Sequence, residues 1–124
     1  MEPRETGDRE AIDKAMNSLA PLDVSAAEDV LREAKEIMDE LGVVFFLRQG
    51  TCLGAVRDSA IMAWDDDIDI GSIIGLHGLT NDSVNGVGDR VGATFTERGF
   101  STKVEQTSSF TYVLLLKSDV RIDW

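Results

Sequence analysis

Apolar side chains recur at helical spacing in the first third of the chain, most clearly between Ser25 and Gly42. The sequence Ser25–Glu28 has the form of a capping box, and Gly42 stands where a helix commonly ends in a left-handed residue. The stripe between them contains Val30, Leu31, Ala34, Ile37, Met38 and Leu41. This pattern predicts an amphipathic helix whose apolar side packs on a sheet or on another helix.

A shorter helical pattern comes before it. Asp8 is a possible N-terminal cap for a helix that ends before Pro21. Its apolar face would contain Ile12, Ala15, Met16 and Leu19. We expect residues 1–22 to form a peripheral helix or tail, and residues 23–124 to form the main domain, because 124 residues suffice for one domain.

Short runs rich in β-branched and aromatic residues, or with alternating polarity, predict strands. The runs are 43–47, 66–71, 100–106, 111–117 and 120–124. The first is continuously apolar, which is typical of a buried strand. The last two are separated by Ser118 and Asp119, so we expect a tight turn and antiparallel pairing.

Two further helices are indicated. One follows a turn at Gln49 and Gly50 and continues to about Arg57. The other has Val84, Val87, Val91 and Phe95 at helical spacing. It follows possible caps at Asn81 or Asp82, although its glycines each disfavour a helix by about 1 kcal/mol relative to alanine. The order of elements predicts a small α/β (α+β) domain, with a mixed β-sheet and flanking helices.

The composition argues against some classes of function. The formal net charge is −11 and the pI is about 4.3, which argues against a nucleic-acid binder and favours attraction of cations. No apolar run approaches the roughly 20 residues of a membrane span, and the charged N-terminus does not resemble a secretory signal. We therefore expect a cytoplasmic protein. Cys52 is the single cysteine, so an internal disulfide is excluded.

The sequence AWDDDIDIG places four aspartates within five positions. Side chains alternate between the faces of a strand, so Ile68 and Ile70 are expected in the core. The opposite face would carry Asp65, Asp67 and Asp69. Carboxylates about 6.8 Å apart repel by about 2.4 kcal/mol at an effective dielectric constant near 20. A divalent cation, Mg²⁺ or Mn²⁺, converts that repulsion into attraction. The alternative is a solvated acidic edge that discourages aggregation.

The last strand can add a third carboxylate. In VRIDW, three apolar residues alternate with Arg121 and Asp123. If this strand lies beside the acidic one, Asp123 joins the cluster. Otherwise Asp123 is an ordinary surface residue.

The segment GTCLGAVR, residues 50–57, has the features of a phosphate site. Gly50 lets backbone amides approach an anion, and Thr51 can cap the helix or offer its hydroxyl group. Arg57 carries a planar guanidinium that suits phosphate oxygens. An ordinary tight turn with a salt-bridged arginine is the alternative. Carboxylates for a metal together with a phosphate site indicate phosphoryl or nucleotidyl transfer.

The sequence GTCLGAVRDSAIMAWDDDIDIG, residues 50–71, closely resembles the core motif of the LicD family, which includes phosphocholine transferases and fukutin-related proteins. The resemblance implies a nucleotidyltransferase-like core. It also implies that Asp67 and Asp69 are the metal-binding pair, that Asp123 is the third acid, and that Gly50 and Thr51 hold phosphate.

Members of that family use a divalent metal to move a phosphorylated alcohol, such as phosphocholine or ribitol phosphate, from a CDP-linked donor to a glycan hydroxyl. The resemblance therefore implies an enzyme of this type, with Mg²⁺ or Mn²⁺ as cofactor and a glycan or small molecule as acceptor. One alternative is a minimal nucleotidyltransferase acting on a small molecule or protein. Another is a non-catalytic truncated remnant, because family members continue with further helices after the third acid.

Overall fold

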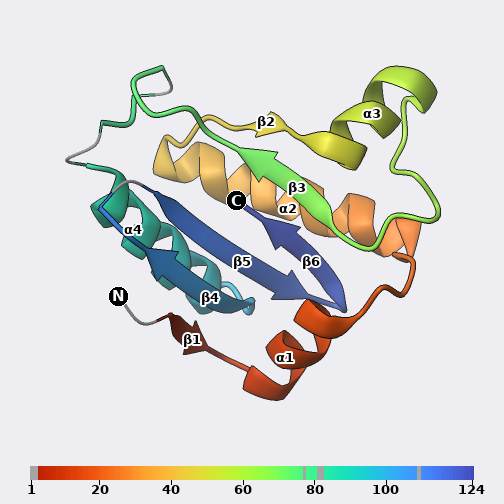
Figure 1. Ribbon diagram of the computed structural model, residues 1–124, viewed down its shortest axis with the longest axis horizontal. Coiled ribbons are helices and arrows are strands. Elements are labelled where there is room, and N and C mark those ends of the chain that lie inside the picture. The colour runs from red at the N-terminus through yellow and green to blue at the C-terminus, as the bar shows by residue number, and fades with distance from the viewer. Residues whose placement is uncertain (1–2, 77, 81–82, 109) are drawn as a thin grey trace.

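A six-stranded mixed sheet with the order β1-β4-β5-β6-β3-β2 forms the centre of the computed structural model (Figure 1). The structure describes residues 3–76, 78–80, 83–108 and 110–124. The strands are β1 (Arg4–Thr6), β2 (Phe46–Leu47), β3 (Ile68–Gly71), β4 (Ser101–Gln106), β5 (Thr111–Lys117) and β6 (Val120–Asp123). The helices are α1 (Arg9–Asn17), α2 (Val24–Leu41), α3 (Gln49–Asp58) and α4 (Val84–Glu97). The predicted α/β class with a mixed sheet and flanking helices is confirmed.

Apolar side chains on the two faces of β5 build two separate clusters. Val113 and Leu115 belong to the main core, which α2 and α4 cover from behind the sheet in Figure 1. Leu114 and Leu116 point the other way and pack with Ile12 of α1. Strand alternation therefore places α1 on the opposite face from α2 and α4.

The amphipathic helix α2 is confirmed, with its N-terminus two residues earlier than predicted. The N-cap is Asp23, whose side chain accepts a hydrogen bond from the amide of Ala26, so the capping-box prediction at Ser25 is wrong. Gly42 ends the helix at a φ of 72°, as expected. Within the described residues, the helices all lack the combination of length and apolar character that a membrane span requires.

The first 22 residues contribute two elements to the fold. Asp8 caps α1 as predicted, and Ile12 is fully buried. The helix ends at Asn17, so Leu19 lies beyond it and is exposed. The strand β1, which the sequence did not predict, pairs antiparallel with β4.

The glycine-rich helix α4 is also confirmed, with Ser83 at its N-cap position. The caps considered at Asn81 and Asp82 lie outside the described residues. A Cβ atom added to Gly88 would lie 2.5 Å from Thr111 Cγ2, and one added to Gly92 would lie 2.8 Å from Val104 Cγ2. The glycines thus weaken the helix locally but let it pack closely on the sheet.

The predicted buried strand over residues 43–47 is shorter and more exposed than expected. Only Phe46 and Leu47 are in strand conformation, and they pair antiparallel with β3 at the edge of the sheet. Val43 is buried, whereas Val44 and Phe46 are exposed. An edge position explains this, because one side of the strand has no neighbouring strand to cover it.

Candidate metal and phosphate site

Strands β3 and β6 run parallel and bring three carboxylates together. In their register Ile68 lies beside Ile122, and Asp69 lies beside Asp123. Both isoleucines are fully buried in the main core, so the aspartates project from the opposite face. One carboxylate oxygen from each of Asp67, Asp69 and Asp123 lies within 4.8 Å of the others.

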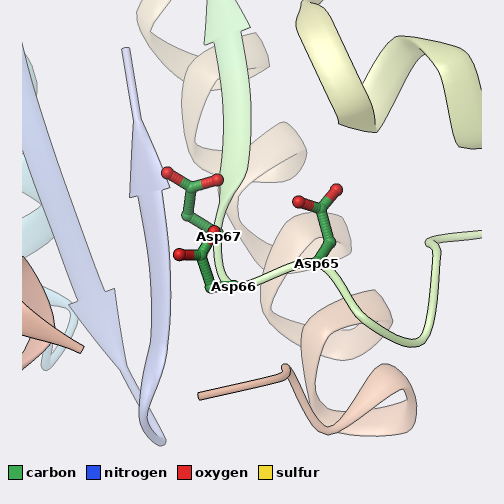
Figure 2. A group of neighbouring side chains, drawn as sticks. All are labelled: Asp65, Asp66 and Asp67. Atoms are coloured by element: carbon green, nitrogen blue, oxygen red, sulfur yellow. The ribbon is translucent and has the colours of Figure 1, made fainter. Parts of the chain in front are cut away.

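The entry to β3 carries two further carboxylates. Figure 2 shows Asp66 and Asp67 on the side of β6, whereas Asp65 points toward α3. Oxygens of these three residues also lie within 4.8 Å of one another. The strand begins at Ile68, two residues later than predicted, so strict alternation between faces does not extend to Asp65.

Burial and mutual repulsion disfavour the charged forms of these acids. Burial, followed by the charge of Asp69 and contact with Asp123, raises the pKa of Asp67 to about 7. Burial and the charge of Asp123 also raise the pKa of Asp69, although the cations Arg48 and Arg121 oppose this. Burial and the neighbouring negative charges therefore favour the protonated forms of Asp67 and Asp69.

Hydrogen bonds connect the N-terminal end of α3 to Asp69 of β3. Thr51 is buried, and its hydroxyl oxygen accepts a hydrogen bond from the amide of Asp69 at 2.9 Å. The amide of Arg48 donates to the carbonyl oxygen of Asp69 at 2.8 Å. Arg48 is the N-cap residue of α3, and Thr51 lies within the helix, so the capping role, one of the two predicted for Thr51, is wrong.

Gly50 lies against Asp65. A Cβ atom at Gly50 would be 2.9 Å from Asp65 Oδ2, so glycine permits this close approach. Among the described residues, Asp65 Oδ2 is a buried side-chain oxygen without a hydrogen-bond partner. Burial, and then the charge of Asp66, raises the pKa of Asp65.

Arg57 lies farther along α3 and is exposed to solvent. Its guanidinium pairs with Asp58 at 3.0 Å and lies 5.7 Å from the centre of the Trp64 ring. The ion pair and the aromatic contact give this side chain a defined place beside the loop that leads to Asp65.

Comparison with known proteins identifies the family. The family model for the LicD/FKTN/FKRP nucleotidyltransferase domain matches residues 42–119, more than half of the chain. The chain belongs to this family. Its relatives include the human ribitol-5-phosphate transferase FKTN, which is 39% identical over 49 residues, covering 40% of this chain and 11% of that protein. The mouse protein of the same name is 40% identical over 48 residues, covering 39% of this chain and 10% of that protein. The matched segment thus spans about a tenth of these relatives' length.

The donor set suits the divalent cation typical of the LicD family. Three carboxylates, from β6, from β3 and from the residue before β3, supply hard oxygen ligands at a spacing that one ion can bridge. Burial, and then the neighbouring carboxylates, raise the pKa values of Asp67 and Asp69, so a bound cation would stabilise their charged forms. The residues present therefore fit Mg²⁺ or Mn²⁺.

Tyr112 and Arg121 both contact the third acid of this LicD-type cluster, and the role of Tyr112 was not expected from the sequence. Tyr112 donates a hydrogen bond to Asp123 Oδ1 at 2.6 Å, and Arg121 Nε donates to the same oxygen at 3.0 Å. Burial, and then the bond to Asp123, raises the pKa of Tyr112, so its hydroxyl group stays protonated. Strand alternation offered a signal, because Tyr112 shares a face with Leu114, the partner of Asp123 on β5.

Arg48 is a third neighbour, and its position depends on a glycine. A Cβ atom at Gly71 would lie 2.6 Å from Arg48 Cδ, so the arginine stem crosses β3 directly over Gly71. Its charge opposes the rise in the pKa of Asp69. Arg48 therefore adds positive charge beside the acidic cluster.

Proposed function

We propose that the chain is a metal-dependent transferase that moves a phosphorylated alcohol, such as phosphocholine, from a CDP-linked donor to the hydroxyl group of a glycan or a small molecule. The observation that carries the proposal is the convergence of Asp67, Asp69 and Asp123. Membership of the LicD/FKTN/FKRP family and similarity to a ribitol-5-phosphate transferase support this reaction class.

In this proposal each part of the site has a separate task. Asp67, Asp69 and Asp123 would hold Mg²⁺ or Mn²⁺, which when bound neutralises phosphate charge and favours loss of the acceptor proton. Gly50 and Thr51, at the start of α3, would place backbone amides near the donor phosphates. Arg57 would contribute a charged donor to the phosphate oxygens.

The transfer step conserves atoms and charge. The acceptor oxygen forms a bond to the phosphorus that carries the alcohol, and the bridging bond between the two phosphates breaks. CMP leaves with the bonding electron pair. The proton of the acceptor hydroxyl group would pass to solvent water, because Asp123 serves as a metal ligand in this proposal.

Product analysis with a panel of donors tests this proposal. The protein is incubated with Mn²⁺, an acceptor panel of sugars and polyols, and CDP-choline, CDP-ribitol, CTP or ATP in turn. We expect release of CMP from a CDP-alcohol and its loss in Asp67→Ala and Asp69→Asn. Asp39→Asn is the control, because Asp39 pairs with Lys35 on the exposed side of α2.

The products also discriminate between the alternatives. Pyrophosphate release from CTP or ATP would favour a nucleotidyltransferase. Absence of turnover with every donor, in a folded protein that binds metal, would favour a non-catalytic role. Turnover at the wild-type rate in either aspartate variant would contradict the proposed site.

A further inference from the structure

Two side chains outside the carboxylate cluster converge on Asp123. The Tyr112 hydroxyl group and Arg121 Nε both donate to Asp123 Oδ1, at 2.6 Å and 3.0 Å. Arg121 Nη2 also lies 3.4 Å from the Tyr112 hydroxyl oxygen. The three groups thus form a closed triangle of hydrogen bonds that restricts rotation of the carboxylate.

This triangle is attached to α1. Arg121 Nη1 donates to the carbonyl oxygen of Ala15 at 3.3 Å, within the last turn of the helix, and the same oxygen accepts from the Ser18 amide at 3.4 Å. Tyr112 packs against the cluster formed by Ile12, Leu114 and Leu116. Three nitrogens of one planar guanidinium therefore connect the end of α1, the tyrosine hydroxyl group and the carboxylate.

Repulsion from the neighbouring acids makes this restraint important. Asp123 lies beside Asp69, and its carboxylate is also within 4.8 Å of an Asp67 oxygen. A carboxylate free to rotate would turn away from its neighbours when no cation is present. A carboxylate held by two donors remains close to them, so less ordering is required when a cation binds.

We propose that Tyr112 and Arg121 are positioning residues that hold the Asp123 carboxylate in the orientation needed to share a divalent cation with Asp67 and Asp69, with α1 as their support. This inference rests on the proposed function, because it assigns these residues a task in the same metal site. Residues that orient metal ligands typically change metal affinity 10-fold to 100-fold when they are replaced.

Mn²⁺ titration calorimetry tests the proposal without measuring activity. Tyr112→Phe removes only the hydroxyl group. Arg121→Lys keeps the charge but loses the planar guanidinium group with its three donor nitrogens. We expect each to weaken Mn²⁺ binding about 10-fold while the circular dichroism spectrum is unchanged. Thr102→Val is the matched control, because it removes a buried hydroxyl group that bonds to Thr96 at 3.1 Å on the α4 side of the sheet.

The outcomes separate this inference from the proposed function. Wild-type affinity in Tyr112→Phe and Arg121→Lys would overturn the positioning roles and leave the metal site intact. An equal loss of affinity in Thr102→Val would also overturn them, because general destabilisation would then explain the effect. Failure of the wild-type protein to bind Mn²⁺ would overturn the proposed function and this inference with it.

Discussion

Asp69 and Asp123 are direct neighbours on the parallel strands β3 and β6. The strands are far apart in the sequence, and the buried pair Ile68 and Ile122 fixes their register. Because side chains alternate along each strand, a core contact on one face aligns two carboxylates on the other. The hydrophobic core and the acidic site thus depend on the same strand pairing.

The burial of Asp67 and its crowding by other acids predict that the stability of the metal-free protein depends on pH. The pKa of Asp67 rises to about 7 in the folded protein, so the native state binds more protons than the unfolded state between about pH 4 and pH 7. The contribution of this group to stability is fully present below about pH 4 and is lost as the pH rises through 7.

Asp67→Asn should therefore stabilise the metal-free protein at pH 8, by about 1–2 kcal/mol after allowance for solvent screening, and should have little effect at pH 4. Urea unfolding in EDTA at both pH values measures the difference. Asp39→Asn should show no such gain at pH 8, because Asp39 lies 2.6 Å from the Lys35 ammonium group. A variant that is less stable than the wild type at pH 8 would contradict this electrostatic account.

Gly54 of the LicD motif and Gly86 of α4 predict a contrast in stability. A Cβ atom at Gly54 would lie 2.5 Å from the carbonyl oxygen of Ala60, so Gly54→Ala should destabilise the protein by about 1–3 kcal/mol. Gly86 has open space around it in α4, and Gly86→Ala should stabilise by up to about 1 kcal/mol. Thermal unfolding of both variants measures these effects. Equal stability of the two would show that α3 does not pack against residues 60–62 as described.

The place of Arg57 predicts a selective effect on donor binding. Arg57→Met should raise the KM for the CDP-linked donor about 10-fold, a loss of roughly 1.4 kcal/mol, because one charged contact to phosphate disappears. The affinity for Mn²⁺ alone should not change, since Arg57 pairs with Asp58 and not with the three central carboxylates. Steady-state kinetics and metal titration together check this. A weakened Mn²⁺ affinity in this variant would contradict the proposal that Arg57 acts only in binding the donor phosphate.

Local sequence patterns predicted most of the elements. The stripe on α2, the Asp8 cap of α1 and the turn at Ser118 and Asp119 each have a local physical cause, and each is present. The strand β1 was missed because its three residues, Arg4–Thr6, have no strand pattern of their own and depend on pairing with β4. The edge position of β2 likewise follows from the strand order, which periodicity does not specify.

Part of the candidate site was also predictable from the sequence. The alternation of polar and apolar residues indicated the faces of Asp69 and Asp123, and the motif over residues 50–71 indicated the LicD family. Alternation does not specify which strands are neighbours, so the contact between the two acids needed the structure. The contribution of Tyr112 depends on the direction of its side chain from β5 toward Asp123 on β6, and a linear pattern does not contain this direction.

A crystal structure with Mn²⁺, in which the ion is located by its anomalous scattering, tests the central claim most directly. The account predicts one ion bound by oxygens of Asp67, Asp69 and Asp123 at about 2.0–2.3 Å, with loss of the anomalous peak in Asp69→Asn. An ion bound elsewhere, or a peak of equal height in Asp69→Asn, would contradict it.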